Sequence, residues 1–162
     1  MREAVLNNTV QSVSPLWDLE SLEEWGEQPE LLAAKNVLIV EDDSSTVSLF
    51  KTMIHNFDED ALIKSIPSAE VAEKYLRELK RNGLPGPDVA MIDYRLSGKD
   101  GLYVCHILET YFPLTKIVLV SGMSHEEVSR KIQEHHLKIE FLQKPIERRQ
   151  ILHILQTENI YT

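Results

Sequence analysis

The chain of 162 residues has room for one domain and a modest appendage, and its 43% hydrophobic content is enough for a buried core. Its formal net charge of −9, without any basic cluster, excludes nucleic acid as an expected partner. Because Cys105 is the only cysteine and no apolar run approaches the roughly 20 residues of a membrane span, we expect a cytoplasmic protein without disulfides or membrane segments.

The first 35 residues differ in composition from the rest of the chain. They contain both tryptophans, Trp17 and Trp25, and seven acidic residues against two basic ones. A Ser-Pro pair at positions 14–15 is a typical helix start. We predict a partly helical N-terminal extension over residues 1–35, which docks either on the following domain (residues 36–162) or on a second copy of the chain.

Five apolar runs follow, each typical of a buried strand and each succeeded by a helical pattern. The runs cover residues 37–40, 61–66, 89–92, 117–120 and 139–142. Ser44 or Ser45 is expected to cap the first helix, and Ser124 with Glu127 forms a capping box before the fourth. The alternation predicts a doubly wound α/β fold with a five-stranded parallel sheet.

Polar side chains follow four of the five predicted strands. They are Glu41 and Asp42 after the first strand, Asp93 after the third, Ser121 after the fourth and Lys144 after the fifth. In the strand order 2-1-3-4-5, strands one and three are neighbours, and ligands bind outside their carboxyl ends. The second strand, which offers no polar group, lies at the edge of such a sheet.

The predicted group of acids is typical of a cation site. Three neighbouring carboxylates disfavour one another's charge unless a cation joins them, and an oxygen-only set suits Mg²⁺ ahead of Zn²⁺. Lys144 offers a positive charge and Ser121 a hydroxyl to a phosphoryl group. The residues together predict a phosphoryl-transfer site with Asp93 as a carboxylate nucleophile, although each alone has an ordinary role as a cap or turn residue.

The chain from residue 36 to about residue 155 resembles the receiver domain of two-component response regulators. The likeness rests on the segments VLIVEDD, MIDYRLSGKDG, IVLVSG and FLQKP, in the family's order and at its spacing. It implies a flavodoxin-like receiver fold with sheet order 2-1-3-4-5. It also implies a phosphorylation-activated switch of the stand-alone type, with Mg²⁺ as cofactor, a histidine kinase or phosphotransfer protein as donor, and a protein as target.

The resemblance implies a role for each residue around the phosphoryl group. Asp93 is the phosphoacceptor, Lys144 pairs with the phosphoryl oxygens, and Gly122 contacts the phosphoryl group. Ser121 moves toward the phosphoryl group, and Phe141 is the switch aromatic that turns inward when Ser121 moves.

The resemblance also implies that Mg²⁺ is held by the carboxylates of Glu41, Asp42 and Asp93 and by the backbone carbonyl of Arg95. The sequence departs from the family at two of the neighbouring positions. Glu41 stands where Asp is commoner, which adds a methylene, and Ser97 stands where Pro is usual.

Two other functions remain as alternatives. A pseudo-receiver would be an interaction module with an inert pocket, but it would not need three acids, a hydroxyl and a lysine. A Mg²⁺-dependent phosphohydrolase would need a general acid–base near the nucleophile, for which His125 is the nearby candidate. We expect His125 to be an exposed residue in the first turn of a helix. The chain is therefore expected to catalyse only its own phosphorylation and dephosphorylation.

Overall fold

The structure, a computed structural model, describes residues 34–157. A strand and a helix alternate five times within this range. The strands are β1 (Asn36–Val40), β2 (Leu62–Ile66), β3 (Val89–Asp93), β4 (Lys116–Ser121) and β5 (Glu140–Gln143). The helices are α1 (Ser44–His55), α2 (Ala69–Arg81), α3 (Gly101–Tyr111), α4 (His125–Glu134) and α5 (Arg148–Gln156). The helix predicted near residues 14–15 and the docking of the extension lie outside the described residues.

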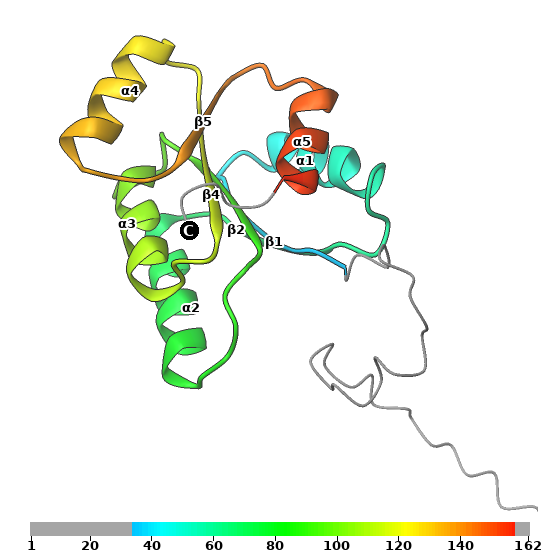
Figure 1. Cartoon of the computed structure of the whole chain (residues 1–162), viewed down its shortest axis with the longest axis horizontal. Coiled ribbons are helices and arrows are strands. Elements are labelled where there is room, and N and C mark those ends of the chain that lie inside the picture. Colours follow the sequence, from blue (N-terminus) through cyan, green and yellow to red (C-terminus); the bar gives the residue numbers. More distant parts are fainter. Residues whose placement is uncertain (1–33, 158–162) are drawn as a thin grey trace, which may run out of the picture. The chain divides into compact units, whose positions relative to one another are not determined.

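The five strands form one parallel sheet in the order β2-β1-β3-β4-β5, which confirms the predicted order. Figure 1 shows the strands between α2, α3 and α4 on one side and α1 and α5 on the other. In the centre of the sheet, Val40 of β1 lies opposite Ile92 of β3. On the other side of β3, Asp93 lies opposite Val120 of β4. The residues that follow β1 and β3 therefore emerge side by side at the carboxyl edge of the sheet.

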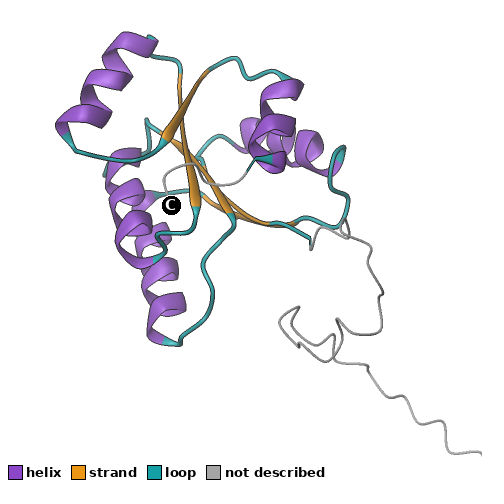
Figure 2. Ribbon diagram, in the orientation of Figure 1, coloured by secondary structure: helices purple, strands orange, loops and turns teal. Residues whose placement is uncertain are grey.

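Helices cover both faces of the sheet (Figure 2). Helices α2, α3 and α4 pack on one face around a core that includes Leu76, Leu108 and Val128. Helices α1 and α5 pack on the other face, around Ile54 and Ile151. Because both faces are covered, β3 and β4 are buried along their whole length, which explains the apolar runs over residues 89–92 and 117–120. Within residues 34–157, no helix is long and apolar enough to cross a lipid bilayer.

The cap of α1 differs from the prediction. Asp43, rather than Ser44 or Ser45, is the N-cap, and its carboxylate accepts hydrogen bonds from the N–H groups of Ser45 and Thr46. Hydrogen bonds from Thr46 and Ser45 hold the pKa of Asp43 below its ordinary value. Both carboxylate oxygens of Asp43 therefore serve as hydrogen-bond acceptors at the start of α1. The capping box over residues 124–127 at α4 is confirmed.

Gly101, the first residue of α3, sits where two backbone segments approach closely. A Cβ atom at this position would lie 2.2 Å from the carbonyl oxygen of Asp93 and 3.0 Å from the Cα of Tyr94. The Gly101 N–H also donates a hydrogen bond of 2.9 Å to the carbonyl oxygen of Tyr94. The absence of a side chain at Gly101 therefore allows α3 to start directly against the backbone that carries Asp93.

We expect Gly101→Ala to lower the free energy of unfolding by about 1–3 kcal/mol, because backbone rather than a flexible side chain must move aside. Urea denaturation measures this change. Gly122→Ala is the matched control, since a Cβ there would meet no atom within 4 Å. Equal stability of the two variants would contradict the steric argument.

Candidate functional site

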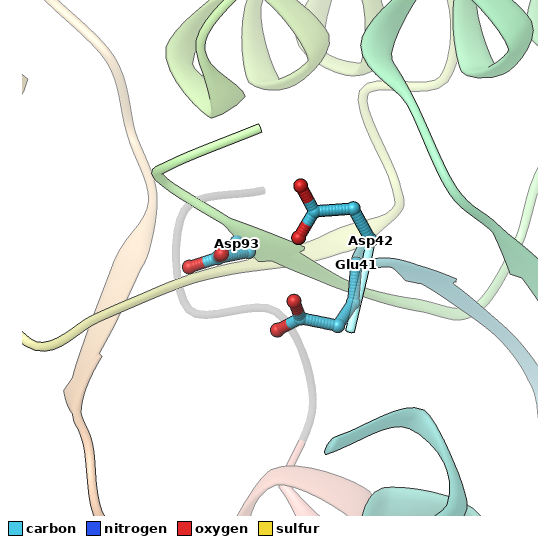
Figure 3. A group of neighbouring side chains, drawn as sticks. All are labelled: Glu41, Asp42 and Asp93. Atoms are coloured by element: carbon cyan, nitrogen blue, oxygen red, sulfur yellow. The ribbon is translucent and has the colours of Figure 1, made fainter. Parts of the chain in front are cut away.

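The three predicted acids meet at the carboxyl edge of the sheet (Figure 3). Glu41 and Asp42 follow β1, Asp93 ends β3, and one carboxylate oxygen from each lies within 4.8 Å of the others. Glu41 is 3% exposed and Asp93 is 8% exposed, whereas Asp42 is exposed to solvent. The site therefore has a buried floor and one ligand at its opening.

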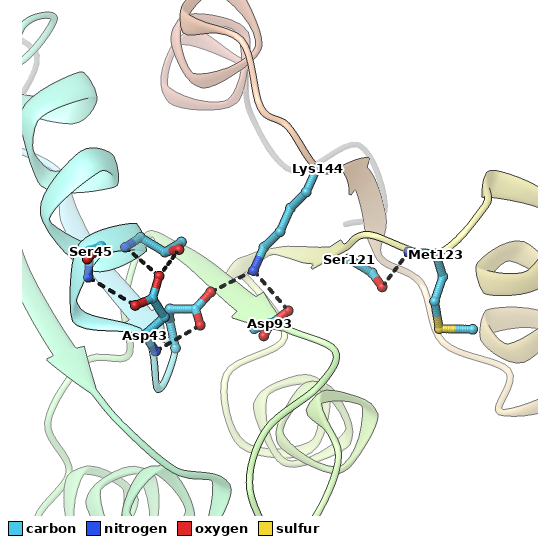
Figure 4. A network of polar contacts seen from close by, with 8 residues as sticks. Asp43, Ser45, Asp93, Ser121, Met123 and Lys144 are labelled. Carbon is cyan, nitrogen blue, oxygen red and sulfur yellow. Dashed lines mark hydrogen bonds and ion pairs between the residues drawn. The ribbon is translucent and has the colours of Figure 1, made fainter.

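Lys144 completes the polar group, as Figure 4 shows. Its Nζ lies 2.9 Å from Oε2 of Glu41 and 3.4 Å from Oδ1 of Asp93. The residue follows β5, and its N–H donates to the carbonyl oxygen of Ser121 at 2.8 Å. The backbone is thus fixed beside β4, while the long side chain reaches over the end of β4 to the acids.

The ion pair between Lys144 and Glu41 offsets the desolvation cost of placing both charged groups away from water. Oε1 of Glu41 accepts a hydrogen bond of 3.1 Å from the N–H of Asp43, and Oε2 accepts one from Lys144. Burial raises the pKa of Glu41 above its ordinary value, although the hydrogen bond with Lys144 opposes the rise. Burial alone would lower the pKa of Lys144, but its hydrogen bond with Glu41 and the charge of Asp93 outweigh burial and raise it. Lys144 is therefore charged at neutral pH.

The composition of the site fits a hard divalent cation. Three carboxylates and one ammonium leave an excess of negative charge when all are ionised. The donors from Glu41, Asp42 and Asp93 are all oxygens, which Mg²⁺ prefers. Glu41 has two oxygens already hydrogen-bonded, but a carboxylate oxygen retains a second lone pair for a cation.

Ser121 and Gly122 lie at the carboxyl end of the neighbouring strand β4, and the hydroxyl of Ser121 is hydrogen-bonded to the backbone of its own loop. Ser121 ends β4 and is 1% exposed. Its Oγ accepts a hydrogen bond of 3.1 Å from the N–H of Met123 and points toward that residue, away from Asp93 (Figure 4). Gly122 is exposed in the loop that follows. Their roles toward a phosphoryl group stay predictions.

Phe141 lies half-buried in β5 and has a partner that the sequence did not predict. The ring of His125 meets the ring of Phe141 edge-on, with centroids 5.6 Å apart and planes at 61°. Nδ1 of His125 lies 3.1 Å from Oγ of Ser129. His125 is exposed, as predicted, but it packs on the predicted switch aromatic instead of facing the acids. Arg95 is exposed in the loop after β3, and its carbonyl as a cation ligand stays a prediction.

A further contact at the acids was also missed. The hydroxyl of Ser97 donates a hydrogen bond of 3.0 Å to Oδ2 of Asp42. Ser97 stands where the family usually has Pro, and a hydroxyl at this position could have suggested a hydrogen bond to a neighbouring acid. The loop conformation that joins the two residues is not visible in the sequence.

The sheet order and the acids at the carboxyl ends of β1 and β3 define a flavodoxin-like α/β domain with its polar site where the strand order reverses. The sequence pattern of the response regulator receiver domain matches residues 37–156, so the chain belongs to that family. Receiver domains are phosphate-accepting signalling modules of two-component systems, and the resemblance predicted from the sequence is confirmed.

Several known proteins are similar to the chain. Protein-glutamate methylesterase/protein-glutamine glutaminase of Sulfurimonas denitrificans is 29% identical over 93 residues, which cover 57% of this chain and 24% of that protein. The chain therefore spans about a quarter of that relative's length. A CheY-like receiver domain protein from Methanospirillum hungatei has 19% identity and a TM-score of 0.61, over 76% of this chain and 92% of that one. The phosphorylated cyanobacterial phytochrome response regulator RcpA has 20% identity and a TM-score of 0.62, over 76% and 90%. These structures share the fold.

Proposed function

We propose that the protein is a phosphorylation-activated switch in which Asp93 accepts a phosphoryl group from a histidine kinase or a phosphotransfer protein. The observation that supports this most is the position of the Asp93 carboxylate at the end of β3. It lies 3.4 Å from the ammonium of Lys144 and beside the carboxylates of Glu41 and Asp42. Phosphoryl transfer needs a nucleophile, a positively charged side chain and oxygen ligands for a metal ion. Asp93 offers the first, Lys144 the second, and the three carboxylates the third.

In the transfer, a carboxylate oxygen of Asp93 attacks phosphorus and an acyl phosphate forms. The bond from phosphorus to the donor's nitrogen or oxygen breaks, and its electron pair leaves with the donor. Lys144 stabilises the negative charge on the phosphoryl oxygens, and its hydrogen bond to Glu41 keeps its ammonium beside Asp93. A Mg²⁺ ion held by Glu41, Asp42 and Asp93, with the carbonyl of Arg95, would neutralise further charge on the phosphoryl group.

The signal is proposed to leave through the loop after β4. A phosphoryl group adds charge and three acceptor oxygens next to Ser121. The Ser121 hydroxyl then exchanges its contact with Met123 for one with a phosphoryl oxygen, and Phe141 changes its packing against His125. Such a change shifts the population between two surfaces, one of which a partner protein binds.

Incubation of the full chain with acetyl phosphate tests this function. With MgCl₂, intact-mass spectrometry is expected to detect a single added phosphoryl group, and with EDTA the addition should be lost. If no adduct forms under either condition, the inert-pocket interaction module becomes the better description.

We also expect Mg²⁺ to stabilise the fold without any phosphate donor. A ligand that binds only the native state at about ten times its Kd adds about 1.4 kcal/mol to the free energy of unfolding, which thermal denaturation detects. Asp42→Ala should reduce this gain, and without metal it should be no less stable than the parent because one of three clustered charges is gone. Asp60→Ala, at an exposed acid before β2, is the control. If millimolar Mg²⁺ does not change the melting temperature of the parent, the cation site is rejected.

A further inference from the structure

Two acids of the site share Lys144 as a partner, and the third has a partner of its own. Glu41 is held by Lys144 and by the N–H of Asp43, and Asp93 is paired with Lys144. Asp42, the exposed acid, receives the hydroxyl hydrogen bond of Ser97 at 3.0 Å. Ser97 lies in the loop between β3 and α3, so this bond joins the loops that follow the two central strands.

The residues that follow Ser97 are fixed from the opposite side by α2. The N–H of Lys99 donates a hydrogen bond of 3.3 Å to Oε1 of Glu70. Gly98 has a φ of +85°, and a Cβ there would lie 2.6 Å from the same oxygen. The left-handed backbone favours glycine at this position, and a larger side chain would also displace the carboxylate of Glu70.

The side chain of Lys99 adds a second attachment to α2. Its Nζ lies 3.1 Å from Oε2 of Glu73 and 3.8 Å from the centroid of the Tyr103 ring. Hydrogen bonds with Tyr103, Arg77 and Lys99 lower the pKa of Glu73 to about 2, so Glu73 stays ionised at neutral pH. The segment around Lys99 is thus tied to two helices, and Ser97 is presented to Asp42 from a fixed backbone.

We infer that Ser97 is a positioning residue that orients the Asp42 carboxylate for a divalent cation; the inference rests on the cation site of the proposed function. An exposed aspartate samples several rotamers, and binding a cation must select one of them. The hydroxyl of Ser97 selects a rotamer beforehand by holding Oδ2. A carboxylate has two oxygens, so Oδ1 can bind the cation while Oδ2 keeps its hydrogen bond.

The test is the Kd of MgCl₂ for the full chain, measured by isothermal titration calorimetry without a phosphate donor. Ser97→Ala is expected to raise the Kd about three- to tenfold, less than the roughly 10–100-fold typical for hydrogen-bond partners of metal ligands, because Asp42 and Ser97 are exposed. Ser97→Thr keeps the hydroxyl and should remain near the parent. Ser45→Ala, at an exposed serine of α1, is the matched control and should also bind like the parent. The melting temperatures in EDTA should be the same for all four proteins.

An unchanged Kd for Ser97→Ala would overturn the inference. A tighter Kd would overturn it too, because the hydroxyl would then be drawing Asp42 away from the cation. Equal weakening in the Ala and Thr variants would have the same meaning, since Thr retains the donor. Mg²⁺ binding by the parent together with any of these results rejects the role of Ser97 alone, whereas no binding by the parent rejects the cation site as well.

Discussion

Replacing Asp93 by asparagine is expected to abolish phosphorylation by acetyl phosphate or by a cognate kinase. The amide of asparagine has nearly the shape of the carboxylate but is not a nucleophile, so no acyl phosphate can form. The fold should survive the change, because it removes a negative charge that disfavours ionisation of the neighbouring Glu41. Loss of labelling would therefore report chemistry and not unfolding.

The measurement is intact mass after incubation with the donor and MgCl₂, followed by hydroxylamine, which cleaves acyl phosphates. The parent should carry one hydroxylamine-sensitive phosphoryl group, and Asp93→Asn should carry none. Asp60→Asn, at an exposed acid before β2, should be labelled like the parent. Equal labelling of Asp93→Asn and the parent would mean that another residue accepts the phosphoryl group.

Replacing Lys144 by methionine is expected to affect both the reaction and the fold. Removing a fixed positive charge from the transferring group should slow phosphorylation by about 10²–10³-fold. The variant also leaves the buried carboxylate of Glu41 without its ion pair. Because Lys144 is 31% exposed and partly screened by water, we expect the free energy of unfolding at neutral pH to fall by about 1–3 kcal/mol, less than for a fully buried pair.

The loss of stability in Lys144→Met should depend on pH. Burial already raises the pKa of Glu41, and removal of Lys144 takes away an effect that lowers it. A carboxyl whose folded pKa is raised favours folding when protonated, and that contribution is lost as pH rises through the folded pKa. The difference from the parent should therefore be smaller at about pH 5 than at about pH 8 in urea denaturation. Lys138→Met, at an exposed lysine, is the control. A loss that is equal at both pH values would contradict the role assigned to Glu41.

The sequence predicted the central strands of the sheet well, because they are buried on both faces. The central strands are covered on both faces, so their apolar runs are continuous and their polar neighbours mark the strand ends. The fifth strand was less clear and lies one residue later than predicted, at Glu140–Gln143. Its first residue pairs at 3.2 Å with the buried Lys116, which also donates a hydrogen bond to Thr157. A charged residue such as Glu140 can begin a strand when it has an ion-pair partner. The sequence alone does not show that Lys116 is that partner.

The candidate site was predictable in its main residues and not in its contacts. Parallel strands bring their carboxyl ends to one edge, so strand order alone places Glu41, Asp42 and Asp93 together. The closer approach of Lys144 to Glu41 than to Asp93 depends on side-chain conformation, which the sequence does not show. The contacts of Ser97 and His125 depend on loop geometry, which has no periodic pattern in the sequence.

The pair of Lys144 and Glu41 has a consequence for the life of the chain in the cell. The two residues are separated by 103 positions, so the site joins the loops after the first and the last strands. A growing polypeptide on the ribosome carries Asp93 long before it carries Lys144, and strand pairing over such separations is slow to form. In the proposed function, a nascent chain would therefore carry the acceptor Asp93 before it carries the ammonium of Lys144. We expect phosphorylation of Asp93 to become efficient only after residue 144 has been translated and the sheet has formed.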